Sequence, residues 1–254
     1  MTSPLETAAT DQMTVAAGEM TLVEHLEELR WRIIKSVLAI AGGFVICFIY
    51  HVPLISLLLA PARRLKVIAT GGLVFTSPAE YFMAALKSAF FGGVFLALPV
   101  LLYQLVAFVS PGLDARERRW SWVLVAGAAL LFAAGASFSY FALLPVGFNF
   151  LIGFAPASVV HPMLSVGAVL DFSTVFLFAT GAIFQLPIIM LGLALIGVLT
   201  SQQLRRYRKI FIVIAFLIGA LLSPSPDVLS QALLAGALLV LFELSIKLIQ
   251  LAGK

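Results

Sequence analysis

The chain has 254 residues, of which 62% are hydrophobic and only 11% are charged. Ordinary soluble domains contain about 45–50% apolar residues, so this composition excludes a water-soluble globular protein and predicts a membrane protein whose solvent is the lipid bilayer. The net charge of +4 at pH 7 does not indicate nucleic-acid binding, because the cations follow the pattern of membrane topology.

Four long segments contain no Asp, Glu, Lys or Arg, and each exceeds the ~20 residues with which a helix crosses a bilayer. These segments are residues 36–62, 88–113, 120–170 and 172–204. Charge clusters and prolines divide the hydrophobic sequence into six predicted spans, near residues 33–52, 82–108, 120–144, 169–194, 209–222 and 228–246. The predicted fold class is therefore all-α, a polytopic membrane protein with six transmembrane helices, because a helix satisfies its own backbone in lipid.

The Lys and Arg residues predict the orientation of these spans. An even number of spans places both termini on one side of the membrane, and twelve of the 16 Lys and Arg residues lie on that side. The other side, with outer loops near residues 53–80 and 145–168, carries Arg63, Arg64, Lys66 and Lys87. Because cytoplasmic segments are enriched in Lys and Arg, both termini are expected in the cytoplasm.

The two ends of the chain are expected to lie outside the helical domain. Residues 1–20 contain three acids and no Lys or Arg, unlike a basic signal peptide or a transit sequence. They predict a flexible cytoplasmic tail, followed by one six-helix domain over residues 21–247 and a short cytoplasmic tail over residues 248–254. Cys47, the only cysteine, falls in the first span and is expected to be a buried free thiol.

The fifth and sixth helices are expected to be short. Thirteen residues, 210–222, separate the inner cations from the next turn, and at a rise of about 1.5 Å they cover about 20 Å of a ~30 Å hydrocarbon core. Either the bilayer thins locally, or this hairpin lies deeper in the bundle and contacts protein. The sequence leaves both explanations open.

The sequence lacks the motifs of catalysis and of metal binding. It has no Walker-type phosphate loop, no Ser or Cys nucleophile motif, and its three histidines lie in separate segments: His25, His51 and His161. We therefore expect no cofactor, no metal site and no enzymatic activity.

Several polar residues fall within or beside the predicted spans. Gln104 and Gln185 must find a partner, which is either a neighbouring helix or a substrate or partner protein. Glu80 and Asp171 lie near helix starts, where an acid is favoured for structural reasons. Glu243 is spaced to pair with the lysine four residues later, near the cytoplasmic interface.

A charged segment, residues 21–33, precedes the first span. A capping box at its start and apolar residues at helical spacing predict an amphipathic helix along the membrane interface. Within it, Glu28 is expected to pair with Arg32 at i, i+4, and Glu27 with Arg30 at i, i+3, for only a few tenths of a kcal/mol each.

The acids Glu24 and Glu117 admit two interpretations. Glu24 has no cation four residues later and faces Glu28 instead, while Glu117 lies among three arginines of the inner loop at residues 109–119. Solvated helix ends explain both acids simply. The other interpretation is a site that receives a cation from another molecule.

Seven short motifs follow one another along the chain: Glu24–Arg32, Ser77–Phe82, Leu98–Gln104, Phe108–Leu113 with Glu117–Arg119, Phe184–Pro187, Leu204–Arg208 and Ser223–Gln231. In this order they resemble the TatC family, the multi-span receptor of twin-arginine protein translocation. The resemblance covers about residues 20–247, and the ordered set is specific although each motif is short.

This resemblance implies a function and partners. The cytoplasmic face is expected to bind a signal peptide with two consecutive arginines on folded export cargo and to recruit single-span TatA-type and TatB-type subunits, with the proton-motive force as energy source. A homo-oligomer within the receptor complex is also implied, and so is a location in a bacterial inner (cytoplasmic) membrane or a thylakoid-type membrane. Adjacent side chains of an extended peptide point in opposite directions, so two arginines need two acceptors, and guanidinium groups suit carboxylates.

The resemblance also implies the residues of the signal-peptide site. Glu28 and Glu117 are expected to supply the carboxylates, with Arg30, Phe108 and Pro111 shaping the site, and the charge argument adds Glu24. A second group is expected in intramembrane polar or partner contacts: Gln104, Gln185, Asp227 and Gln231.

Two of these positions have particular features. Gln185 stands where many members of the family carry Glu, so it can form hydrogen bonds but cannot titrate. Asp227 is equally well explained as a cap of the sixth helix. The fifth and sixth helices are expected to be the main docking ground for the single-span subunits.

The alternative function is a small-solute or ion secondary transporter. Such a protein needs an ionisable site or a broken helix pair near the middle of the membrane, and Gln104 with Gln185 gives that little support. An integral-membrane enzyme would need a nucleophile and a base within reach of each other, and the sequence nominates neither.

Overall fold

The computed structural model describes residues 22–63, 72–109, 120–154, 163–222 and 228–253. Within these ranges the chain is helical apart from turns, short irregular segments and one isolated bridge between Val74 and Ser165. The helices are α2 (Leu22–Ile49), α3 (His51–Arg63), α5 (Glu80–Val109), α7 (Trp120–Phe138), the π-helical η2 (Ser139–Leu143), α8 (Leu144–Phe154), α9 (Val166–Ile183), α10 (Leu186–Leu195), α11 (Ser201–Arg206), α12 (Arg208–Leu222) and α13 (Val228–Leu251).

In the part of the chain that the structure describes, five helical stretches are long and apolar enough to cross a membrane: Leu26–Ile49, Glu80–Phe108, Leu124–Phe154, Val166–Leu195 and Val228–Leu251. The helix α12, which directly precedes the last of these stretches, has 15 residues and is not among the five. The last helix, α13, has 24 residues and continues to Leu251, so it is longer than the short sixth helix that the sequence predicts. Its run of Leu, Ala and Ile contains no Pro, and a helical backbone continues where nothing interrupts its hydrogen bonds.

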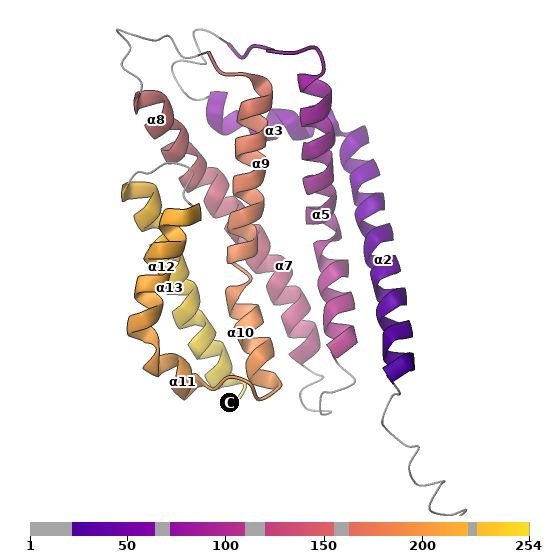
Figure 1. Cartoon of the computed structure of the whole chain (residues 1–254), viewed down its shortest axis with the longest axis vertical. Coiled ribbons are helices and arrows are strands. Elements are labelled where there is room, and N and C mark those ends of the chain that lie inside the picture. Colours follow the sequence, from indigo (N-terminus) through magenta and orange to yellow (C-terminus); the bar gives the residue numbers. More distant parts are fainter. Residues whose placement is uncertain (1–21, 64–71, 110–119, 155–162, 223–227, 254) are drawn as a thin grey trace, which may run out of the picture.

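The sequence also predicts an outer loop at residues 53–80, but α3 forms part of that segment. It runs across the long helices at one end of the bundle (Figure 1). Pro53 is its third residue, and a proline in the first turn removes an N–H that has no helical partner. The buried side chains of Ile55, Leu58 and Leu59 join the core formed with α5, α8 and α9, which explains why this short apolar run is helical.

The third span is longer than predicted and contains an irregular turn. The predicted span ends near residue 144, whereas α7, η2 and α8 continue without a break to Phe154. Pro145 has no N–H to donate to the preceding turn, and the π-helical turn at Ser139–Leu143 lies directly before it. In that turn the Leu144 N–H donates to the Ser139 carbonyl.

Glycines allow two of the long helices to pack with their backbones in contact. A Cβ on Gly43 of α2 would lie 2.5 Å from the Gly93 carbonyl oxygen of α5, and one on Gly93 would lie 2.4 Å from the Phe44 nitrogen. Small residues serve this purpose between membrane helices, where lipid gives no hydrophobic drive for association. This contact holds α2 against α5 and brings their polar residues together.

The start of α2 and the C-terminal end of α13 lie at the same end of the bundle (Figure 1). We call this the α2-start end, and the end that carries α3 and the starts of α5 and α9 the α3 end. Residues 1–20, the predicted N-terminal tail, lie outside the described residues. Residues 248–251 of the predicted C-terminal tail belong to α13.

Candidate functional site

Arg32 is the centre of a polar cluster at the α2-start end. Its Nε donates to Glu28 Oε1 over 3.0 Å, and the two side chains form the predicted salt bridge. Its Nη1 donates to Gln104 Oε1 over 3.3 Å, and its Nη2 donates to the Ala107 carbonyl oxygen over 3.0 Å. One guanidinium therefore ties the first turns of α2 to the last turns of α5.

The two carboxylate oxygens of Glu28 differ in their surroundings. Oε1 accepts from Arg32, whereas Oε2 is buried and has no hydrogen-bond partner among the described residues. The Glu28 side chain is 21% exposed. A carboxylate has about four acceptor positions, and leaving a buried acceptor unpaired is unfavourable, so Glu28 has capacity for a further donor.

The other residues predicted for this site are described to different extents. Arg30 is exposed, and Phe108 is half-buried near the end of α5. Glu24 lies in α2, but its side chain is not described. Glu117 and Pro111 lie outside the described residues. The structure thus brings Glu28 to the same end of the bundle as the last turn of α5, which carries Phe108.

The structure contains one of the two salt bridges that the sequence predicts within this segment. The Glu28–Arg32 pair is confirmed, but Glu27 and Arg30, both described, form no salt bridge with each other. Gln104 makes an interhelical bond, as one of its two predicted roles requires. Nothing in the sequence links Arg32 to Gln104, because their 72-residue separation follows no helical period and their contact depends on how α2 packs against α5.

Gln185 lies in a second polar position, at the break between α9 and α10. The break precedes Pro187, which cannot donate to the preceding turn. Gln185 Nε2 donates to the Ala128 carbonyl oxygen of α7 over 2.9 Å, while its Oε1 is buried without a partner among the described residues. Gln185 therefore also connects two helices, and its Oε1 can still accept a hydrogen bond.

Gln231 and Glu243 of α13 each form a polar contact with α12. Gln231 Nε2 donates to the Phe216 carbonyl oxygen over 3.2 Å. Glu243 Oε2 accepts from Arg208 Nη2 over 2.6 Å, so the prediction that it pairs with the lysine four residues later is wrong. The long Arg208 side chain reaches Glu243 because the antiparallel packing of α12 and α13 brings the two together. Asp227 lies outside the described residues.

At the α3 end, Glu80 forms a clamp between two segments. Its Oε2 accepts from the Thr76 N–H and hydroxyl, each over 2.6 Å, and its Oε1 accepts from the Gly167 N–H over 2.6 Å. A Cβ on Gly167 would lie 2.7 Å from the Glu80 carboxylate, so glycine is needed for this approach. Glu80 thus has the structural role that the sequence predicts. It serves the start of α9 as well as the start of its own helix.

Lys87 of α5 and Asp171 of α9 form a second contact at the α3 end. Lys87 Nζ lies 2.8 Å from Asp171 Oδ2, and both side chains are about half exposed. The sequence explains Asp171 only as a residue near a helix start, and this pair is not predicted from it. Among the described residues, no group of three or more His, Cys, Asp or Glu could hold a metal ion.

These features define a multi-pass α-helical membrane protein whose described polar contacts mainly join helices to one another. The chain matches the model of the family described as Sec-independent protein translocase protein (TatC) over residues 24–236. The chain therefore belongs to the TatC family. It is a component of a protein-translocation system and is not an enzyme.

Relatives from bacteria and a plant agree with this assignment. The chain is 39% identical to the Sec-independent protein translocase protein TatC of Synechocystis over 236 residues, covering 93% of this chain and 90% of that one. It is 40% identical to the TatC of Aquifex aeolicus, covering 92% and 97%, and 39% identical to the chloroplastic TATC of Arabidopsis thaliana, covering 93% and 68%.

Solved structures of the family have the same fold. One, described as the crystal structure of the twin-arginine translocase receptor TatC, has a TM-score of 0.73 at 39% identity and covers 91% of this chain and 100% of its own. A second, of the same receptor in the detergent DDM, has a TM-score of 0.75 at 38% identity and covers 89% and 99%.

Proposed function

We propose that this chain is the receptor core of a twin-arginine translocase. Its cytoplasmic face binds the Arg-Arg signal peptide of folded export proteins and recruits single-span TatA-type and TatB-type subunits, and the proton-motive force drives transport. The single observation that carries this proposal is the second oxygen of Glu28, which is buried without a partner at the α2-start end.

Arg32 prepares Glu28 for an incoming guanidinium. By donating to Oε1 it holds the carboxylate in one orientation, and its bonds to Gln104 and the Ala107 carbonyl hold Arg32 itself. Oε2 then accepts from one arginine of the signal peptide. A charge-assisted bond to a guanidinium is about twice as strong as a neutral one, which favours arginine at this position.

The second arginine of the motif needs a second acceptor, which we assign to Glu117. In an extended peptide, adjacent side chains point in opposite directions. Glu117 belongs to the loop that follows α5, and α5 ends beside Arg32. We further assign Arg30, Phe108 and Pro111 to shaping the site, and Glu24 to adding negative charge one turn before Glu28.

This function requires six spans with both termini in the cytoplasm. We assign the fifth span to α12, whose 15 residues make it short for a bilayer. Cysteines placed in the N-terminal tail and after α13 should react with a membrane-impermeant maleimide in inverted but not in right-side-out vesicles. The opposite labelling pattern would refute the orientation.

The single-span subunits are expected to dock at α12 and α13. Exposed apolar side chains of α12 recur at helical spacing along one face, namely Ile210, Val213, Leu217 and Leu221. Gln231 and its bond to Phe216 lie at the junction of the two helices. The receptor complex contains more than one copy of this chain.

The direct test compares two neighbouring acids of α2. A photo-crosslinker at position 31 leaves Glu28 intact and lies three residues from it, on the same helix face. Labelling of a fluorescent Arg-Arg signal peptide should fall about 10-fold in Glu28→Gln, which corresponds to about 1.4 kcal/mol. Glu27→Gln, which changes an exposed acid next to it, should have no such effect.

A Lys-Lys version of the peptide completes the experiment. It should label the wild-type chain weakly, because an ammonium cannot form the paired bonds of a guanidinium. Equal labelling by both peptides would refute the guanidinium site. Equal losses in Glu28→Gln and Glu27→Gln would show that only the general negative charge of α2 matters.

A further inference from the structure

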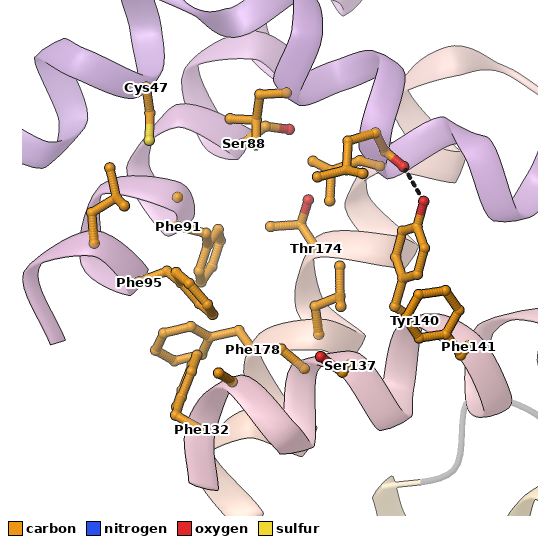
Figure 2. A pocket seen from close by; sticks show the side chains of 18 residues that line it. Cys47, Ser88, Phe91, Phe95, Phe132, Ser137, Tyr140, Phe141, Thr174 and Phe178 are labelled. Atoms are coloured by element: carbon orange, nitrogen blue, oxygen red, sulfur yellow. Dashed lines mark hydrogen bonds between the residues drawn. The ribbon is translucent and has the colours of Figure 1, made fainter. Parts of the chain in front are cut away.

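A pocket of about 450 Å³ lies at the α3 end, between α2, α3, α5, α7, η2 and α9 (Figure 2). Its wall is mainly apolar, and phenyl rings from three helices form one part of it: Phe91, Phe95, Phe132 and Phe178. Its volume falls within the roughly 300–1,000 Å³ of typical ligand sites. None of the residues assigned to signal-peptide binding lines it.

The lining of the pocket reaches the surface of the bundle. Three of its lining residues are also strongly exposed on the surface of the protein: Phe141 is 69%, Leu57 57% and Leu96 51% exposed. Two of them lie in stretches long and apolar enough to span the membrane, so this surface faces the bilayer. A ligand that enters from there must come from lipid rather than from water.

Two buried hydroxyl groups in the wall lack partners. Ser88 and Thr174 are 2% and 6% exposed, and neither Ser88 Oγ nor Thr174 Oγ1 has a hydrogen-bond partner among the described residues. Both residues line the pocket, and Figure 2 shows them away from the cluster of phenyl rings. Buried hydroxyls are normally bonded, so a fitting ligand carries acceptor oxygens as well as an apolar body.

The Lys87–Asp171 ion pair lies next to the pocket, toward the helix starts. On α5, Lys87 precedes Phe91 by four residues, and on α9, Asp171 precedes Thr174 by three, so each ionic residue lies one turn from a pocket residue on the same face. Lys87 Nζ has three N–H donors and gives bonds to the two oxygens of Asp171. A further donor is left for an anionic oxygen.

We infer that this pocket binds one acyl chain of a bilayer phospholipid. The chain lies against the phenyl rings, ester oxygens accept from Ser88 and Thr174, and the phosphate lies beside Lys87. A transmembrane helix offers neither ester oxygens for the two hydroxyls nor a phosphate for Lys87, because its backbone carbonyls are bonded within the helix. The inference is independent of signal-peptide recognition at the other end of the bundle.

The test uses a phosphatidylethanolamine probe with a photoactivatable diazirine near the end of one acyl chain. The full chain is reconstituted in phosphatidylethanolamine–phosphatidylglycerol vesicles with this probe, and the labelled residues are mapped by mass spectrometry. Labels should concentrate on the phenyl-ring cluster rather than on the exposed apolar faces of α2 and α12. An even spread of labels over the lipid-facing residues would overturn the inference. This measurement uses the wild-type chain, so it does not depend on the folding of any variant.

Two alanines of α7 provide matched variants. Ala136 lines the pocket, whereas Ala134 is exposed and does not. Ala136→Phe fills the pocket and should reduce labelling there at least five-fold, while Ala134→Phe should leave it unchanged. Equal labelling in both variants would refute the pocket as the binding site. Displacement of the label by an unlabelled Arg-Arg signal peptide would show that a peptide is the occupant and would also overturn the inference.

The position of the phosphate has its own test. Lys87→Gln should reduce labelling by the phospholipid probe about three-fold and should leave unchanged the labelling by a diacylglycerol probe that lacks phosphate. Equal reduction with both probes would show that Lys87 acts only on the shape of the pocket, which would refute its contact with the headgroup.

Discussion

Glu28 at the α2-start end and Glu80 at the α3 end differ in how completely their carboxylates are bonded. Both oxygens of Glu80 accept hydrogen bonds within the protein, from Thr76 and from Gly167. Glu28 uses one oxygen for Arg32, and the other is buried without a partner among the described residues. A fully bonded carboxylate serves the fold, whereas a half-bonded one can still receive a ligand.

The two ends also differ in how their polar contacts are supported. At the α3 end, backbone N–H groups supply two of the donors to Glu80, so the clamp orders the chain between α3 and α5 against the start of α9. At the α2-start end, the Arg32 guanidinium donates to the side chains of Glu28 and Gln104 and to one backbone group, the Ala107 carbonyl oxygen. Side chains reorient more readily than backbone, so the contacts of Glu28 are easier to rearrange than those of Glu80, as the proposed capture and release of a peptide requires.

The largest effect on stability is expected when the Glu80 clamp is broken. In Gly167→Ala the new Cβ displaces the Glu80 carboxylate from the Gly167 N–H, so the midpoint of thermal unfolding in detergent should fall by several degrees. In Gly42→Ala the Cβ meets nothing within 4 Å, so this control should gain up to about 1 kcal/mol from helix propensity.

A double-mutant cycle sharpens this prediction. If the carboxylate of Glu80 is the group that Gly167→Ala displaces, the substitution should cost much less in a Glu80→Ala background. If Gly167→Ala lowers stability equally in the Glu80→Ala background, Gly167 matters for the packing of α9 itself. The Glu80 carboxylate would then not be the group that stabilises the α3 end.

A smaller effect is expected when the positioning group at the α2-start end is removed. Arg32→Ala removes the bonds to Glu28, Gln104 and the Ala107 carbonyl, and we expect a loss of about 1–2 kcal/mol, because the pair is partly exposed and solvent replaces some of its bonds. Signal-peptide binding should weaken as well, since Glu28 is no longer oriented. Chemical unfolding in detergent together with the crosslinking assay measures both.

Arg32→Lys is the matched control for Arg32→Ala. A lysine keeps the charge but cannot form the forked contacts with three acceptors. Stability should therefore recover in part, while peptide labelling stays low. Full recovery of labelling would mean that Arg32 acts only through its charge.

The smallest effect on stability is expected at Glu117. The sequence places Glu117 among three arginines outside the predicted spans, so Glu117→Ala should change the unfolding free energy by no more than about 0.5 kcal/mol and should still weaken peptide capture. Loss of membrane-inserted protein in this variant would refute its assignment as a binding residue.

The sequence alone predicts the helical membrane class, because bilayer thickness acts on each hydrophobic run separately and requires no knowledge of its neighbours. It also predicts the Glu28–Arg32 pair, because an i, i+4 spacing brings two side chains together within one helix. The sequence does not predict the helix α3, which lies across the others, because its 13 residues are too few for a span and become helical through packing.

Tertiary structure alone decides which polar groups are satisfied. Arg32 meets Gln104 across 72 residues of sequence, Lys87 meets Asp171 across 84, and Glu80 meets Gly167 across 87. These contacts depend on how closely the helices pack and in which register. Glycines such as Gly93 allow that close packing. Hydropathy and charge act locally along the chain, but the surroundings of a carboxylate oxygen depend on residues far away in sequence, so the difference between Glu28 and Glu80 is visible only in the folded protein.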